Sequence, residues 1–257
     1  MISSTNWIGY LTILRKETVR IFRIWPQTFL PSVVTQSLYL IIFGGLIGAR
    51  LGSIDGTSYV AFLVPGLVMM SAITNAFSNT AGSFFGAKFQ RCIEEILVSP
   101  MKPWVILAGY VSGGVVRGVF VGMAVLLVSA FFTSIQVAHV FIFLFFLLMT
   151  CLIFSLLGFL NGMFARKFDD VSIVPTFLLT PLTYLGGVFY SLEFLPTFWR
   201  NVSYANPIVY MIDGFRYGFS GTFTTPVFMS ALILLLVAGG LILFGLKLLK
   251  KGAGLRV

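Results

Sequence analysis

Few side chains in this sequence of 257 residues could act as a nucleophile or a base, and Ser220 is the first candidate. It lies in Gly218-Phe219-Ser220-Gly221, a G-x-S-G pattern in which intramembrane serine proteases carry their nucleophile. Such a serine needs a base within hydrogen-bond reach. The one histidine of the sequence, His139, precedes Ser220 along the chain.

The order of these two residues argues against proteolysis. In rhomboid-type proteases the histidine follows the serine, whereas His139 comes before Ser220 here. Ser220 also falls at a predicted junction between a loop and a helix. We therefore interpret the motif as a turn before the last membrane span, and a rhomboid-like protease using Ser220 and His139 stays as the alternative.

The remaining residues assemble neither a nucleotide site nor a metal site. The G-x-x-x-x-G-K-[ST] loop that holds nucleotide phosphates is missing, since the glycines and lysine of residues 82–88 have the wrong spacing. Cys92 and Cys151 lie far apart and accompany a single histidine, so no Cys/His ligand set forms. We expect no cofactor on this chain, and any ATP and Mg must then be held by a separate subunit.

Arg117 is the one charged residue deep inside a predicted span, since Lys247 lies two residues from the end of the sixth span. Proton-driven transport needs titratable groups inside the bilayer, and arginine stays charged at physiological pH. A proton or sodium antiporter is therefore disfavoured. Gly114, Gly118 and Gly122 follow one helical face beside Arg117 and allow close helix contact. We favour a structural role for Arg117, with a gating role as the alternative.

Two other sets of charged residues have structural interpretations. Asp213 and Arg216 are three positions apart on a predicted helix and can pair on one face. Asp169 and Asp170 precede a predicted span, where the dipole of a helix N-terminus favours negative charge.

The composition requires lipid around these residues. Hydrophobic residues make up 58% of the chain and charged residues 10%, against about 45–50% and about 25% in soluble domains. The chain is therefore an integral membrane protein in contact with membrane lipid. Its formal net charge of +9 does not indicate nucleic acid, because the basic residues are spread over short loops and termini.

The hydropathy pattern predicts an all-α fold in one domain, residues 1–257. A membrane span needs about 20 mostly apolar residues. An interfacial helix over residues 1–26 precedes a bundle over residues 27–257. Six spans are predicted, at Thr28–Ala49, Tyr59–Ser83, Trp104–Phe132, Val140–Phe164, Val171–Tyr190 and Val227–Leu249.

The distribution of basic residues predicts the orientation. Short cytoplasmic loops are enriched in lysine and arginine. One side of the predicted bundle has only Arg50, Arg200 and Arg216. The other side, which holds both termini, has Arg15, Lys16, Arg20, Arg23, Lys88, Arg91, Lys102, Arg166, Lys167, Lys247, Lys250, Lys251 and Arg256. Both termini are therefore predicted to be cytoplasmic, which agrees with an even number of spans.

Three segments outside the spans carry their own patterns. Residues 7–25 place Leu11, Leu14, Thr18, Ile21 and Trp25 on one face, which predicts an amphipathic helix lying flat at the cytoplasmic interface until Pro26 ends it. Residues 86–100 alternate apolar and charged faces and predict one short cytoplasmic helix. Residues 191–225 are apolar but too short in each half to span, which predicts a re-entrant helical hairpin with Asn206 as N-cap and Pro207 at N1.

Aromatic residues on two spans are candidates for lining a path. Phenylalanine is abundant, at 28 residues. Phe77 lies on the second predicted span, and Phe177, Tyr184 and Phe189 lie on the fifth. Aromatic side chains on a span usually face lipid or neighbouring helices, so lining the path of an amphipathic substrate is the less favoured of the two interpretations.

Three motifs in order resemble the membrane subunit, or permease, of ABC-2 type transporters. Residues 59–66, Tyr-Val-Ala-Phe-Leu-Val-Pro-Gly, resemble the opening of that family's second span. Residues 86–100 resemble its coupling helix. Residues 206–216, Asn-Pro-Ile-Val-Tyr-Met-Ile-Asp-Gly-Phe-Arg, resemble its extracytoplasmic hairpin. The likeness extends over nearly the whole chain and is strongest to small bacterial permeases whose ATPase is a separate protein.

This resemblance implies an exporter in the bacterial inner membrane. It implies a homodimer of this chain with two copies of a cytoplasmic ABC ATPase, and a drug, lipid or glycan substrate. The residues it places at the ATPase contact are Gly86, Lys88, Phe89, Arg91, Glu94, Glu95 and Pro100. An uncoupled channel or scaffold remains a further alternative.

Overall fold

The computed structural model is almost entirely helical and describes residues 2–48, 53–54, 57–135, 137–221, 226–252 and 254. Its elements in chain order are α1 (Ile2–Arg23), α2 (Trp25–Tyr39), η1 (Leu40–Ile47), β1 (Ser53–Ile54), β2 (Thr57–Ser58), α4 (Tyr59–Phe89), α5 (Cys92–Val98), α6 (Pro103–Ser129), α7 (Val140–Phe164), α8 (Phe168–Val174), η2 (Pro175–Leu179), α9 (Thr180–Leu185), η3 (Leu192–Phe194), α10 (Thr197–Tyr204), α11 (Pro207–Ser220) and α12 (Val227–Lys251). The two strands form one antiparallel pair of two residues each.

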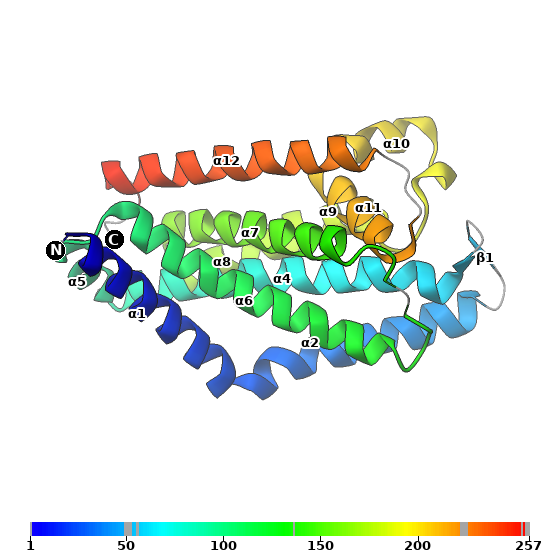
Figure 1. The fold of residues 1–257 in the computed structure, drawn as a ribbon, viewed down its shortest axis with the longest axis horizontal. Helices are drawn as coiled ribbons and strands as arrows, with labels where there is room; N and C mark the ends of the chain where they lie inside the picture. Colours follow the sequence, from blue (N-terminus) through cyan, green and yellow to red (C-terminus); the bar gives the residue numbers. More distant parts are fainter. Residues whose placement is uncertain are drawn as a thin grey trace.

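Within the described residues, five helices are long and apolar enough to cross a membrane. They are the continuous helix Trp25–Gly45, which joins α2 to η1, and α4, α6, α7 and α12. These helices run along the length of the molecule (Figure 1). They confirm five of the six predicted spans, and α7 begins and ends where the sequence pattern predicts.

The fifth predicted span, Val171–Tyr190, is the exception. The chain there forms three successive helical segments, α8, η2 and α9, from Phe168 to Leu185, and η2 is a π-helix. Pro175 and Pro181 lack an amide N–H, so the regular α-helical hydrogen bonds cannot continue through them. The π-helix has a wider turn that accommodates the missing hydrogen bonds, and in it the Thr180 N–H donates to the Pro175 carbonyl five residues earlier. The predicted span is thus helical only as far as Leu185, with a π-helical stretch within it, and residues 186–190 are not helical.

Helix α4 is the centre of the bundle. Its side chains are mostly buried, whereas α2 and α12 are mostly exposed. The sequence of α4 alternates large apolar residues with alanine, serine and asparagine, which lets α6 and α7 approach its backbone closely. At Gly118 of α6, an added methyl group would lie 2.8 Å from the Cys151 sulfur and 2.9 Å from the Ala76 Cβ.

Helix α1 packs along α6 with a face that matches the predicted apolar face only in part. Ile13, Glu17 and Ile21 are buried, and of these only Ile21 is on the predicted face. Leu11 and Trp25, which were also predicted on it, are exposed. The reason is a row of glycines on α6. A methyl group at Gly109 would lie 2.7 Å from an Ile13 side-chain carbon, and one at Gly113 would lie 2.6 Å from the Glu17 Cβ. The turn predicted at Pro26 is confirmed between α1 and α2.

The two ends of the bundle differ in what they carry. The start of α1, the end of α12 and the short helix α5 gather at one end, and α10 with the β1–β2 pair lies at the other (Figure 1). A chain that starts and finishes at the same end crosses the length of the bundle an even number of times.

Candidate functional site

At the end of the bundle that holds the termini, a sharp corner joins α4 to α5. Helix α4 continues to Phe89, Arg91 adopts a left-handed conformation with φ 60°, and α5 starts at Cys92. The single helix predicted over residues 86–100 is therefore wrong. Gly86, Lys88 and Phe89 belong to the last turn of α4. Helix α5 alone forms a separate short helix in this segment.

Lys88 fastens this corner to the neighbouring helix α7. Its side chain is buried, and Nζ donates hydrogen bonds of 2.9 Å to the carbonyl oxygens of Met163 and Ala165. These carbonyls lie at the C-terminus of α7, where a positive charge is favoured by the helix dipole. Lys88 thus lies inside the molecule and joins the corner directly to the end of α7.

The outer surface of the corner is not packed against any other part of the described chain. Phe89 is 58% exposed and Val98 is 86% exposed, and Glu94 and Glu95 are exposed on α5. Arg91 and Pro100 are also exposed, whereas Gly86 is only partly so. Inside the corner, Phe168 of α8 packs at 5.0 Å from the Phe85 ring and 4.9 Å from the Phe89 ring. The corner therefore presents two carboxylates beside apolar side chains.

A buried polar cluster connects α1 with α4. The Glu17 carboxylate is fully buried, pairs with Arg20 at 2.7 Å and accepts a hydrogen bond of 2.5 Å from the Ser83 hydroxyl. Arg20 also donates to the Asn79 side-chain oxygen at 2.9 Å. Glu17 is not among the site residues predicted from the sequence. Its spacing of four from Ile13 and from Ile21 could have indicated its burial, since the three residues share one helical face.

Arg117 of α6 lies beside the same face of α4. Its Nε donates to the Asn75 side-chain oxygen at 3.2 Å, and the Asn75 amide donates to the Ser32 hydroxyl of α2 at 2.9 Å. Asn75 therefore links three helices at one level. The guanidinium is partly exposed, and no ion pair joins it to the part of the chain that the structure describes.

The predicted caps at Asn206 and at Asp170 are confirmed. The Asn206 side chain accepts from the Ile208 N–H at 3.0 Å and donates to the Leu182 carbonyl at 2.6 Å, with Pro207 at N1. Asp170 accepts from the backbone N–H groups of Arg166 and Lys167. These two hydrogen bonds lower the pKa of the Asp170 carboxyl.

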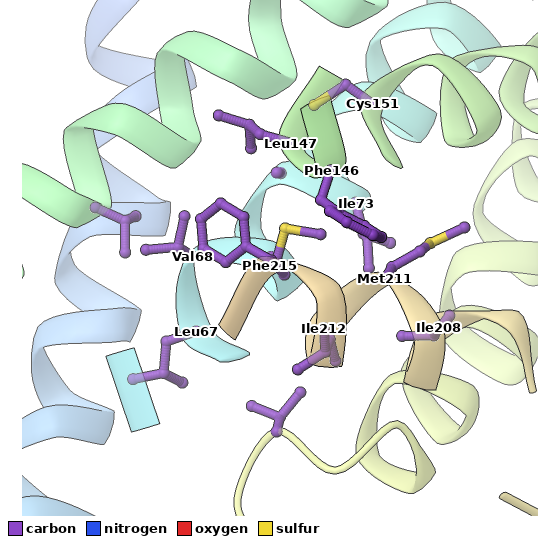
Figure 2. Packing of buried hydrophobic residues seen from close by; sticks show 14 of the residues in the cluster. Leu67, Val68, Ile73, Phe146, Leu147, Cys151, Ile208, Met211, Ile212 and Phe215 are labelled. Atoms are coloured by element: carbon purple, nitrogen blue, oxygen red, sulfur yellow. The ribbon is translucent and has the colours of Figure 1, made fainter. Parts of the chain in front are cut away.

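Helix α11 is a buried element. Ile208, Met211 and Phe215 are at most 1% exposed and point into a cluster with side chains of α4 and α7 (Figure 2). Asp213 is buried as well. The Arg216 guanidinium lies 4.0 Å from the centre of the Phe62 ring and donates to the Gly187 carbonyl at 3.1 Å. The pairing of Asp213 with Arg216 stays a prediction.

The four candidate path residues do not form one group. Phe189 packs against Tyr39, Phe43 and Tyr184. Phe177 is 75% exposed on η2, and Phe77 is 1% exposed on α4. Only Tyr184 and Phe189 thus share a cluster, and a path-lining role for any of the four stays a prediction.

Ser220 ends α11, and the following Gly221 adopts φ 74°, a left-handed conformation that suits glycine at the end of a helix. This geometry agrees with the turn interpretation of the G-x-S-G pattern. The His139 ring stacks on Tyr217 at 5.2 Å. The Ser220 side chain lies outside what the structure describes.

Residues 9–220 match the ABC-2 type transporter family. The chain belongs to this family. Over 251 residues it is 55% identical to the inner membrane transport permease YadH of Escherichia coli (strain K12), which covers 97% of this chain and 98% of that protein. It is 26% identical over 214 residues to Nodulation protein J of Rhizobium leguminosarum bv. viciae, covering 81% of each chain.

Family membership confirms the resemblance that the three sequence motifs indicate. In this ABC-2 chain the motifs lie in α4, at the α4–α5 corner and in α11. The first and third are packed inside the bundle, so their residue types follow in part from burial. The corner alone combines exposed carboxylates with exposed apolar side chains, and is therefore our candidate for contact with a partner.

Proposed function

We propose that this chain is the permease subunit of an ATP-driven exporter in the bacterial inner membrane, without a nucleotide site of its own. The ABC-2 family and a relative named an inner membrane transport permease support this proposal. The sequence contains no G-x-x-x-x-G-K-[ST] loop, and we therefore propose that a separate cytoplasmic ATPase subunit holds ATP and Mg. We propose a homodimer of this chain with two copies of that ATPase.

The proposed topology has six crossings with both termini in the cytoplasm. The predicted span Val171–Tyr190 supplies the fifth crossing in addition to the five long helices. Its helical part, residues 171–185, rises about 22 Å at 1.5 Å per residue, and the five residues after Leu185 extend it toward the hydrocarbon thickness of about 30 Å. The bias of basic residues toward the end with the termini favours the cytoplasm on that side. The α10–α11 pair is then a re-entrant hairpin at the extracytoplasmic end.

The exposed α4–α5 corner is the observation that carries the proposed coupling. ATP binding would draw the two ATPase subunits together and displace α5. Because Lys88 ties the corner to α7, the displacement moves two helices of the central bundle together. A ligand shifts a conformational equilibrium only by its differential affinity for the two states. The substrate must therefore bind the inward-facing and outward-facing states unequally.

The substrate class is an amphipathic, lipid-like or glycan-bearing molecule. A rhomboid-like protease using Ser220 and His139 is not favoured, because the family is one of transporters and Gly221 explains the motif as a helix end. An uncoupled channel or scaffold would need no ATPase, and the same experiment tests it.

Co-purification tests the proposal. The tagged chain is purified from its own bacterial membrane, and ATPase subunits are quantified per permease. We expect Phe89→Ala combined with Glu95→Arg to lower ATPase retention about tenfold, because both side chains leave the exposed corner. Glu193→Arg is the matched control, since Glu193 is exposed and its carbonyl accepts a hydrogen bond from Arg200 of α10, which lies at the opposite end of the bundle (Figure 1). Wild-type retention in the double variant would refute the corner as the contact, and absence of any ATPase from the wild type would refute the permease assignment.

A further inference from the structure

Two polar faces meet inside the membrane-spanning part of the bundle. On α2, Thr28, Ser32 and Gln36 recur every four residues and share one face. On α4, Asn75 and Asn79 do the same. The hydrogen bond of 2.9 Å from the Asn75 amide to the Ser32 hydroxyl shows that these faces lie against each other. Neighbours on such a face are about 5–6 Å apart, so all five residues belong to one region.

This region holds polar atoms that have no partner in the described part of the chain. They are the Thr28 hydroxyl, the Gln36 side-chain oxygen and the Asn79 side-chain amide nitrogen. The three residues are 1%, 5% and 2% exposed. A buried polar atom without a hydrogen bond destabilises the fold, because it has lost its water and gained no partner. Three such atoms in one region indicate that something polar binds there.

The region also carries a positive charge that no carboxylate balances. Arg117 makes its hydrogen bond to Asn75 through Nε, and in the described part of the chain its two terminal nitrogens have no hydrogen-bond acceptor. The nearby carboxylate of Glu17 is already engaged by Arg20 and Ser83. A charge in the bilayer interior is costly and marks a functional position unless it is paired. The missing partner is an anion.

The depth of Arg117 restricts where that anion comes from. Arg117 lies near the middle of α6, about 20 Å along the axis from either end at 1.5 Å per residue. Along α2, however, the same level lies only four residues after Thr28, because Asn75 joins Arg117 to Ser32. Since the site is enclosed by three helices, an anion reaches Arg117 by entering between α2, α4 and α6.

We propose that Arg117, with the Asn79 amide and the Thr28 hydroxyl as neutral donors, binds the anionic group of an amphiphile as it crosses the membrane. Phosphate is the group that best matches these donors, because its oxygens accept several hydrogen bonds and a guanidinium binds two of them at once. The site lies between α2, α4 and α6. This inference rests on the proposed permease function and names the substrate class as anionic amphiphiles.

Binding of defined probes to the purified full-length chain tests the site. Dioctanoyl phosphatidic acid and dioctanoylglycerol have the same tails and differ in the phosphate. We expect the first to bind at least tenfold more tightly in a native mass spectrometry titration. Arg117→Gln should remove this difference. Lys247→Gln, which loses one exposed charge on α12, is the matched control and should keep it. Equal binding of the two probes to the wild type would overturn the proposal.

A second variant keeps the test decisive if Arg117→Gln does not fold. Asn75→Asp is nearly isosteric and puts a carboxylate oxygen where the Asn75 oxygen now accepts from Arg117. It supplies the missing anion from within the chain, so we expect a folded protein whose phosphatidic acid affinity falls about tenfold. Wild-type affinity in this variant would contradict the site.

Two further measurements distinguish a lipid-borne anion from a free one, and a failure of this site from a failure of the proposed permease function. Displacement of phosphatidic acid by an equal concentration of inorganic phosphate would make this a site for a free anion and would overturn the amphiphile. Loss of phosphate-selective binding with the ATPase still retained would remove only this site. Phosphate-selective binding in a wild type that retains no ATPase would support the anion site and refute the permease assignment.

Discussion

The Glu17 carboxylate on α1 accepts a hydrogen bond of 2.5 Å from the Ser83 hydroxyl on α4, across 66 positions of sequence. Glu17 reaches Ser83 because Gly113 of α6 leaves room for its side chain. The bond fastens the first helix to the central one within a turn or two of the α4–α5 corner. The end of α4 that leads into the corner is therefore hydrogen-bonded to α1 as well as to α7.

We expect Glu17→Ala to lower the free energy of unfolding by about 1–3 kcal/mol, because it leaves Ser83 and part of Arg20 without a buried partner. Glu17→Gln keeps the shape and an acceptor oxygen, and should cost less. Thermal unfolding of the purified chain measures both variants. A double-mutant cycle with Ser83→Ala should show coupling of the two residues, and additive effects would contradict the contact.

Two glycines of α6 should respond to alanine with opposite signs. A methyl group at Gly114 would lie 2.9 Å from the Ala76 carbonyl oxygen of α4, so we expect Gly114→Ala to destabilise by about 1–3 kcal/mol through overpacking. At Gly122 the nearest atoms would be 3.5 Å away, an ordinary contact. Gly122→Ala should be neutral or stabilising by up to about 1 kcal/mol, because alanine favours the helix. Equal unfolding temperatures for both variants would contradict the α4–α6 packing.

Lys88→Met should loosen the junction of α4 and α7. It keeps the length and apolar stem of the side chain but removes both hydrogen bonds to the end of α7. We expect a stability loss of about 1.5–3 kcal/mol and faster amide exchange over residues 163–168, measured by hydrogen–deuterium exchange. Lys102→Met is the control at the same end, since Lys102 is exposed. Unchanged exchange in Lys88→Met would exclude Lys88 as the connection.

Local signals in the sequence predicted much of this structure, and contacts between distant residues account for the rest. Asn206 and Pro207 specify a helix start by their own chemistry, and five spans follow from unbroken apolar runs. The buried face of α1 could not be predicted, because it depends on Gly109 and Gly113 of a helix far along the chain. The left-handed turn at Arg91 was equally hidden, since arginine has no preference for it.

The cap of α8 should depend on the ionised state of Asp170. Its pKa is lowered in the folded chain by the N–H donors of Arg166 and Lys167, so the stabilisation is present above the unfolded pKa of about 3.9 and is lost as pH falls through the lower folded value. At pH 7, Asp170→Asn should therefore speed amide exchange over residues 168–171. Asp169→Asn is the control, because in the described chain the backbone N–H groups at this helix start donate to Asp170 and not to the Asp169 carboxylate. Equal exchange in the two variants would contradict the cap.

Helix α11 should be shielded from water. Ile208, Met211 and Phe215 lie against α4 and α7. Single cysteines at these three positions, in a background with Cys92→Ser and Cys151→Ala, should react at least tenfold more slowly with a membrane-impermeant thiol reagent than a cysteine at Glu193. Glu193 is the control because it is exposed and lies beside α10, whose Arg200 donates a hydrogen bond to the Glu193 carbonyl. The reaction is followed in intact membranes, so that the surrounding lipid and partner subunits are in place.

Slow labelling at all three positions would mean that α11 stays packed at its end of the bundle. Slow labelling that becomes fast when ATP hydrolysis is blocked would instead show that α11 moves with the transport cycle. Rapid labelling at all three positions in both conditions would mean that the helix is an exposed loop, and the packing in Figure 2 would then be wrong.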